Sequence, residues 1–311
     1  MENQIYDVII IGSGPAGLTA AVYAGRARLN TLVLGGTVWG GQLQTTTLVE
    51  NYPGFAEGVQ GPDLMNMFLE QAKRFVSEVK FEDVTKVELT GEIKKVYVAD
   101  KVYQSKSVII ATGAKPKMLG IPGEDTYWNK GVSAYATCDG AFFRNVEVAV
   151  VGGGDTAMEE AEFLTRFASK VHLIHRRDQF RASKIMQEKI LANPKIEVHY
   201  NSEIKEVLGD DKALNSLKIL NNKDNTESEL KVEGLFLAIG HIPLTQFLEK
   251  QLEVDEEEYV IAKNGVYTNI DGVFVAGDVE DNIYRQAITA AGAGCKAAII
   301  AERWLSGIDK V

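Results

Sequence analysis

A strand, a glycine turn and a helix follow one another twice in this chain, and few folds accommodate such a repeat. Residues 6–34 read YDVIIIGSGPAGLTAAVYAGRARLNTLVL, and residues 145–174 read NVEVAVVGGGDTAMEEAEFLTRFASKVHLI. The continuous apolar segment that opens each copy is typical of a parallel strand buried on both faces. The first glycines, Gly12 and Gly152, lie 140 residues apart. That spacing is too long for a solenoid unit and suits two nucleotide-binding domains.

The glycines of both copies have the spacing of a dinucleotide-binding turn. The first copy reads Gly-x-Gly-x-x-Gly from residue 12, and the second reads Gly-x-Gly-x-x-Ala from residue 152. Such a turn lets the backbone approach a pyrophosphate at a helix N-terminus, where free N–H groups and the helix dipole favour anions. One match is weak evidence because glycine turns are common. Two matches, each between a strand and a helix, predict two dinucleotide sites.

The residues after the second strand of each copy bear on which nucleotide is bound. In the second copy this strand leads into HRRDQFR, which contains His175, Arg176, Arg177 and Arg181. No acid stands at the strand end to accept a bond from a ribose 2′-hydroxyl, whereas guanidinium groups match a 2′-phosphate. The second copy therefore favours NADPH over NADH. In the first copy the strand ends in two glycines and leaves the nucleotide undefined.

Two further segments are predicted to end at the ligand crevice. VIIATGAKP, residues 108–116, reads as a strand that closes on Ala-Thr-Gly, and GVFVAGDV, residues 272–279, reads as a strand that ends at Gly277 and Asp278. An acid at the carboxyl end of a parallel strand lies in the crevice where ligands bind. Residues 284–305 predict a helix whose start presents small residues and free N–H groups.

Composition narrows the class of protein. The 311 residues are 45% hydrophobic, so a packed core is feasible. The net charge of −10 argues against a nucleic-acid partner, which would need clustered Lys and Arg. Two cysteines, Cys138 and Cys295, indicate no disulfide framework and favour a cytoplasmic protein. No segment reaches the roughly 18 apolar residues of a membrane span, and no metal ligands are predicted.

These segments together resemble the low-molecular-weight, bacterial-type NADPH-dependent thioredoxin reductases. The resemblance covers essentially the whole chain and rests on GSGPAG, GGQLQTTTLVENYPGF, ATGAKP, ATCDG, GGGDTAMEEA, HRRDQFRAS, AIGHIP and AGDV with RQAITAAGAGC, in the family's order. It implies an α/β fold of two Rossmann-like dinucleotide-binding domains, one inserted in the other, as in pyridine nucleotide-disulfide oxidoreductases. FAD is then expected on the first copy of the repeat and NADPH on the second.

The resemblance also implies a domain plan and partners. A discontinuous FAD-binding domain would comprise residues 1–117 and 244–311, and an NADPH-binding domain carrying the redox motif would comprise residues 118–243. The family forms homodimers, reduces thioredoxin or a thioredoxin-like protein, and swings its NADPH domain between two orientations. Cys295 is expected to be a small buried residue near the flavin.

Cofactor residues follow from the same resemblance. The expected FAD site comprises Gly12, Gly14, Pro15, Ala16, Gly17, Gly41, Gln42, Leu43, Asn51, Ala111, Thr112, Gly113, Gly277, Asp278, Arg285, Gln286 and Ala287. The expected NADPH site comprises Gly152, Gly154, Asp155, Thr156, His175, Arg176, Arg177 and Arg181.

The sequence departs from the family at the redox motif. The family reads Cys-Ala-Thr-Cys-Asp, whereas this chain has Tyr135 in the first position and keeps Cys138 and Asp139. In the family the second cysteine faces the flavin, the first attacks the thioredoxin disulfide, and the acid donates a proton. A phenol, with a pKa near 10 and a hard oxygen, is no disulfide nucleophile.

Disulfide exchange proceeds through a mixed disulfide and needs two sulfurs. The sequence therefore predicts a protein that reduces its flavin and does not turn over thioredoxin. Three interpretations remain open. The chain is a thioredoxin reductase with an inactivating change, or a natural relative whose acceptor is dioxygen, a quinone or a protein carrier, with Cys138 cycling through a sulfenic acid. The third is a non-catalytic, flavin-binding partner protein.

Overall fold

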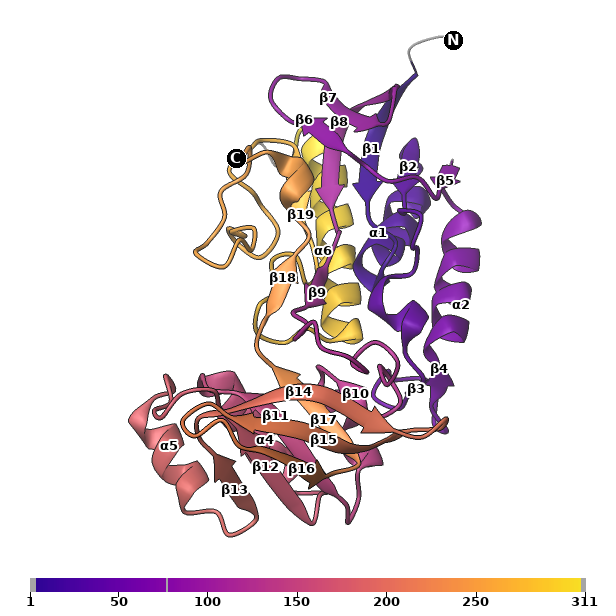
Figure 1. The fold of residues 1–311 in the computed structure, drawn as a ribbon. Helices are drawn as coiled ribbons and strands as arrows, with labels where there is room; N and C mark the ends of the chain where they lie inside the picture. The colour runs from indigo at the N-terminus through magenta and orange to yellow at the C-terminus, as the bar shows by residue number, and fades with distance from the viewer. Residues whose placement is uncertain (1–3, 77, 309–311) are drawn as a thin grey trace. The chain divides into compact units, whose positions relative to one another are not determined.

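The computed structural model describes residues 4–76 and 78–308. The chain divides into two compact units. One unit comprises Met1–Lys115 and Ile242–Val311, and the other comprises Pro116–His241. In Figure 1 the first unit therefore combines the indigo and yellow ends of the chain, and the second holds its magenta and orange middle. The structure shows the predicted α/β fold with one unit inserted in the sequence of the other.

The first unit is built on a seven-stranded sheet with the order β5-β2-β1-β8-β7-β6 and with β19 also paired to β8. Strands β1, β2, β5, β8 and β19 pair in parallel, whereas β7 pairs antiparallel with both β8 and β6. The strands are β1 Ile5–Ile11, β2 Thr31–Leu34, β5 Glu78–Lys80, β6 Lys86–Glu88, β7 Lys94–Val98, β8 Lys101–Ile110 and β19 Val273–Val275, with a separate pair of β3 Leu48–Val49 and β4 Val59–Gln60.

Both faces of this sheet are buried, which explains the unbroken apolar sequence of β1. Val8 and Ile10 pack against the helices, while Ile9 and Ile11 pack into a second core on the opposite face, as alternation along a strand requires. The helices are α1 Pro15–Arg26, α2 Gly61–Lys73 and α6 Ala287–Leu305, with short 3₁₀ turns η1 Gly41–Thr45 and η3 Gln246–Leu248.

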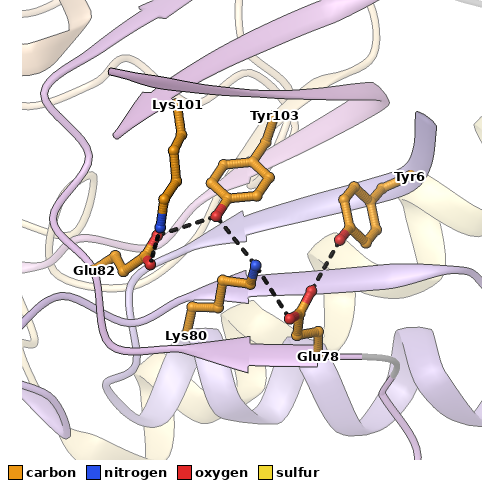
Figure 2. A network of polar contacts seen from close by, with 6 residues as sticks. All are labelled: Tyr6, Glu78, Lys80, Glu82, Lys101 and Tyr103. Carbon is orange, nitrogen blue, oxygen red and sulfur yellow. Dashed lines mark hydrogen bonds and ion pairs between the residues drawn. The ribbon is translucent and has the colours of Figure 1, made fainter. Parts of the chain in front are cut away.

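A polar network ties β5 to β1 and β8 (Figure 2). The Tyr6 hydroxyl donates to Glu78 at 3.0 Å, and Lys80 forms an ion pair with Glu78 at 3.1 Å. Lys80 also donates to the Tyr103 hydroxyl, which donates in turn to Glu82, both at 3.1 Å. Burial raises the pKa of Tyr6 to about 12, so this phenol stays protonated and keeps donating.

The second unit holds a five-stranded parallel sheet and a three-stranded antiparallel sheet. The parallel order is β10-β17-β11-β12-β13, and the antiparallel order is β14-β15-β16. The parallel strands are β10 Val132–Ser133, β11 Glu147–Gly152, β12 Lys170–Ile174, β13 Ile196–His199 and β17 Gly234–Ala238. The antiparallel strands are β14 Ser202–Gly209, β15 Leu214–Asn221 and β16 Glu227–Lys231. The helical segments are α3 Ala136–Asp139, η2 Gly140–Phe142, α4 Asp155–Leu164 and α5 Lys184–Leu191.

The chain changes units in two short strands, β9 Ala114–Pro116 and β18 His241–Pro243, which pair with each other. Backbone bonds continue the pairing on either side, from the Leu244 amide to Gly113 O and from the Lys117 amide to Gly240 O, both at 2.9 Å. Each strand contains a proline, which limits the ladder because proline has no N–H. Among the described helices, none combines the length and apolar character needed to cross a membrane.

Candidate functional site

Three glycines shape the turn between β1 and α1, in two different ways. Gly12 has φ +117°, and a Cβ there would lie 2.1 Å from Ala111 O. A Cβ at Gly17 would lie 2.0 Å from Gly12 O, whereas a Cβ at Gly14 would meet nothing within 4 Å. The first and third glycines therefore permit close backbone packing. The second leaves the backbone open to a ligand, which is the arrangement of a pyrophosphate turn.

The N-terminus of α1 has no side-chain cap beside this open glycine. Gly14 is the N-cap and makes no side-chain cap, Pro15 occupies the first turn, and no acid lies there. Gly41, at φ +63°, comes so close that its Cβ would lie 3.3 Å from Gly14 Cα, and a Cβ at Gly277 would lie 2.8 Å from Ala16 Cβ. Free N–H groups and the helix dipole make this a site for a negative group.

Hydrogen bonds join the other expected FAD residues of the first unit. Gln42 donates to Ala114 O, and the Thr112 hydroxyl donates to Leu244 O at 2.8 Å. Asn51 donates to Gln286 Oε1 at 3.2 Å. Leu43 packs against the core cluster that contains the helices. The other expected residues follow the ends of two strands: Ala111 and Gly113 follow β8, and Gly277 and Asp278 follow β19. These hydrogen bonds join segments of the first unit that lie far apart in the sequence.

The helix expected from residue 284 begins at Ala287, so its predicted start was wrong. Asp281 accepts bonds from the Ile283 and Tyr284 amides at 3.0 and 2.8 Å, and Arg285 has φ +47°. This side-chain-capped turn competes with helix formation, as Asp commonly does. Gln286 then caps α6 through a capping box with its third helical residue.

Asp278 carries a buried carboxylate at the end of β19. Its Oδ1 is buried and has no hydrogen-bond partner among the described residues. Burial, and then the charge of Asp281, raise its pKa to about 7. Burial also raises the pKa of Glu280 to about 7, with Asp281 and Asp278 adding to the effect. An unpartnered buried acceptor beside an open glycine turn fits a ligand hydroxyl, such as that of a dinucleotide ribose or ribityl chain.

These two acids predict a pH dependence for the FAD-free protein. Both folded pKa values lie above the ordinary values of 3.8 and 4.5. Protonation of these two acids therefore stabilises the folded state. This stabilisation is complete below the ordinary pKa values and is lost as pH rises through about 7. We expect the free energy of unfolding in urea to fall between about pH 4 and pH 8. Asp278→Asn should flatten this fall and exposed Asp211→Asn should not; equal profiles for all three proteins would contradict the assignment.

The second unit repeats the glycine turn between β11 and α4. A Cβ at Gly152 would lie 2.4 Å from Ala238 O, whereas a Cβ at Gly154 would meet nothing within 4 Å. Gly154 is the N-cap of α4 and makes no side-chain cap, and Thr156 is exposed in the first turn. Gly153, which the sequence analysis did not single out, is the most constrained, because its Cβ would lie 2.2 Å from the His175 ring.

His175 and Asp155 bind protein groups within this unit. His175 is buried, with Nδ1 3.0 Å from Gly152 O and Nε2 2.9 Å from Gln179 O. The Asp155 carboxylate accepts from the Ser183 amide at 2.9 Å and hydroxyl at 2.8 Å, which lower its pKa. Both side chains therefore hold the loop that carries the arginines.

The arginine loop lies against the second glycine turn. The amides of Arg181 and Ala182 donate to Gly153 O at 2.8 and 3.2 Å. The side chains of Arg176, Arg177 and Arg181 are exposed. The backbone of this loop thus lies against the turn that precedes α4, and its exposed arginines suit a ligand with more than one phosphate.

The redox segment forms the short helix α3 in the second unit. Tyr135 is its N-cap, and its ring lies 5.5 Å from the His241 ring and packs on a core cluster of this unit. Cys138 is half-buried and is not part of a disulfide. The Ser133 hydroxyl donates to Asp139 at 2.5 Å, while burial raises the pKa of Asp139. A raised pKa suits a group that holds and donates a proton.

Cys295 was expected to be buried, but on α6 it is only half-buried. It hydrogen-bonds the Tyr23 hydroxyl on α1, and this bond is the largest cause of the raised Tyr23 pKa. The thiol therefore joins two helices of the first unit.

Comparisons with known proteins agree with this geometry. Residues 6–294 match the family model described as "Pyridine nucleotide-disulphide oxidoreductase". The chain is 55% identical to a thioredoxin reductase of Mycolicibacterium smegmatis, over 99% of each chain. It is 52% identical to a bifunctional thioredoxin reductase/thioredoxin of Mycobacterium leprae, over 98% of this chain and 67% of that protein.

A solved structure extends the likeness to three dimensions. The crystal structure of thioredoxin reductase from Streptococcus pyogenes superposes with a TM-score of 0.93 and 42% identity, over 98% of this chain and 100% of that one. The sequence identities to these relatives are far above the level at which a likeness shows the fold alone. The chain therefore belongs to the thioredoxin reductases of the pyridine nucleotide-disulphide oxidoreductase family, which are enzymes that use FAD and NADPH.

Proposed function

We propose that this chain transfers electrons from NADPH to bound FAD and that Tyr135 prevents their transfer to thioredoxin. The observation that carries the proposal is a tyrosine in the first position of the redox motif, while Cys138 and Asp139 are retained. The relatives' names supply thioredoxin as the acceptor of the family scaffold. A homodimer is also proposed for this chain, because the resemblance to the family implies one.

Residues 1–117 and 244–311 are proposed as the FAD domain. The open backbone at Gly14 would take the pyrophosphate, and the buried Oδ1 of Asp278 would accept a bond from a hydroxyl of the cofactor. Gln42, Asn51 and Gln286 are already held by hydrogen bonds within the unit, so the site is preorganised. FAD, when bound, supplies the two-electron chemistry between NADPH and a later acceptor.

Residues 118–243 are proposed as the NADPH domain. The amides at Gly154 and the start of α4 would bind the pyrophosphate, and the exposed arginines would bind the 2′-phosphate. His175 and Asp155 act as positioning residues, because their polar atoms hold the glycine turn and the arginine loop.

The redox segment can supply one thiol and one proton. Cys138 is the retained sulfur, and Asp139, whose pKa burial raises, is the proposed proton donor to that sulfur. Transfer to a disulfide requires attack by a thiolate and resolution by a second sulfur. The Tyr135 phenol provides neither. Electrons would therefore leave through an acceptor that needs no dithiol, such as dioxygen, a quinone or a protein carrier.

An absorption spectrum tests the proposal. The purified protein, after addition of FAD and removal of the excess, should show a flavin band that NADPH bleaches under anaerobic conditions. The absence of a flavin band would refute the FAD site. A flavin that NADPH leaves oxidised would instead leave a flavin-binding partner protein as the function.

A further inference from the structure

A group of ligand-type side chains lies on one face of three neighbouring strands in the second unit, outside the sites described above. His172 of β12 is in register with Ala149 of β11 and with Glu197 of β13. Alternation along a strand places Glu147 on the same face as Ala149, and His199 on the same face as Glu197. The parallel sheet therefore collects two imidazoles and two carboxylates from separate strands.

The side chains contact one another directly. His172 Nδ1 lies 3.0 Å from His199 Nε2, and His199 Nε2 lies 3.7 Å from Glu197 Oε1. One ligand atom from each of these three residues lies within 4.8 Å of the others. Zinc bonds of 2.0–2.2 Å in tetrahedral geometry separate their donors by about 3.4 Å. Small side-chain rotations would therefore bring all three donors around one ion.

Glu147 fixes the chemistry of His172. Its Oε2 lies 2.8 Å from His172 Nε2. A carboxylate only accepts hydrogen bonds, so His172 Nε2 carries a proton, and the other ring nitrogen, Nδ1, faces His199. A carboxylate is one of the partners that commonly orient zinc-binding histidines. A metal at His199 Nε2 requires that this nitrogen carry no proton, and the other ring nitrogen, Nδ1, can carry it instead.

Charge and burial also favour a cation. His172 is 3% exposed, whereas Glu197 is exposed and opens the cluster to solvent. Lys170 pairs with Glu197 through Oε2 and leaves Oε1 toward His199. Two carboxylates against one ammonium give a net negative cluster.

We propose that His172, His199 and Glu197 bind one zinc ion, with Glu147 positioning His172. The donor set of two histidines and one glutamate is one that zinc accepts, with water completing the tetrahedron. The ion would join β12 to β13. It would act on the stability of this unit, since a ligand that binds only the folded state raises the melting temperature.

Zinc binding to the full-length, FAD-loaded protein tests the proposal. Chelator-treated protein is dialysed against a series of buffered zinc chloride solutions, and bound zinc is measured by mass spectrometry. We expect about one high-affinity zinc per chain in the parent protein. His199→Gln keeps an amide donor for His172 Nδ1 but removes the metal ligand, and it should weaken binding more than about a hundredfold. Glu147→Gln should weaken it about 10- to 100-fold.

Matched controls separate this site from other zinc ligands. Glu229→Gln removes an exposed carboxylate from β16 and should leave zinc affinity unchanged, as should Cys138→Ser. Zinc should raise the melting temperature of the parent but not of His199→Gln. If His199→Gln fails to fold, Glu197→Gln at the exposed carboxylate takes its place, with the same loss expected. No stoichiometric zinc in the parent, or binding abolished by Cys138→Ser and retained by His199→Gln, would overturn the proposal.

Discussion

Tyr135→Cys is expected to give this chain NADPH-dependent thioredoxin reductase activity, which we expect the parent to lack. The new thiol would stand three residues before Cys138, at the first turn of α3. It would supply the sulfur that attacks the thioredoxin disulfide, and Cys138 would supply the one that resolves it. Nucleophile removal typically costs enzymes several orders of magnitude, so we expect kcat/KM for thioredoxin to rise at least about a thousandfold. NADPH oxidation coupled to thioredoxin reduction measures this.

Tyr135→Ser is the matched control. It removes the ring that packs 5.5 Å from His241 but supplies no thiol. Its thioredoxin activity should stay at the parent level, while electron transfer from NADPH to an artificial acceptor should persist in all three proteins. Comparable thioredoxin turnover by Tyr135→Ser and Tyr135→Cys would show that the ring, and not the absent sulfur, blocks the reaction. A Tyr135→Cys protein that forms the disulfide but stays inactive would indicate an acceptor other than thioredoxin.

The double substitution Arg176→Ala with Arg177→Ala is expected to remove the preference for NADPH. Both guanidinium groups are exposed beyond the end of β12, so they are free to bind a 2′-phosphate. Loss of a charge-assisted hydrogen bond costs about 1.5–3 kcal/mol, or roughly ten- to a hundredfold in affinity. Steady-state assays with an artificial acceptor should show the KM for NADPH rising by this factor and the KM for NADH nearly unchanged.

Arg166→Ala provides a control for this pair. Arg166 is an exposed arginine of the same unit that stacks on Phe163, and its loss should change neither KM. An equal rise of both KM values in the double variant would refute the 2′-phosphate assignment. It would point instead to a general role of the arginine loop in holding the glycine turn.

The two nucleotide-binding turns could be predicted from the sequence because their determinants are local. Continuous apolar runs became the buried parallel strands β1 and β11, and the glycine spacing marked the start of α1 and α4. The start of α6 was misplaced because the Asp281 side chain caps a turn that helix propensity alone does not reveal. The comparisons confirm the family that these motifs indicated.

Features that depend on contacts between distant segments were not predicted. The cluster of His172, Glu197 and His199 depends on the register of β12 against β13, which no local pattern fixes. The position of His175 against Gly153 and the buried Oδ1 of Asp278 likewise arise from packing. The sequence yielded no prediction of the antiparallel sheet β14–β16, because its strands mix charged and apolar residues without a glycine motif.

An anaerobic reductive titration tests most directly the claim that Cys138, as a single thiol, forms no second redox centre beside the flavin. Dithionite is added stepwise to the FAD-loaded protein, and the loss of the flavin band is measured against electrons added. A flavin takes up two electrons, and a redox-active disulfide takes up two more. Our account predicts two electron equivalents per flavin for the parent and four for oxidised Tyr135→Cys. Uptake of four by the parent would contradict it, because a second redox centre would then be present without a thiol at position 135.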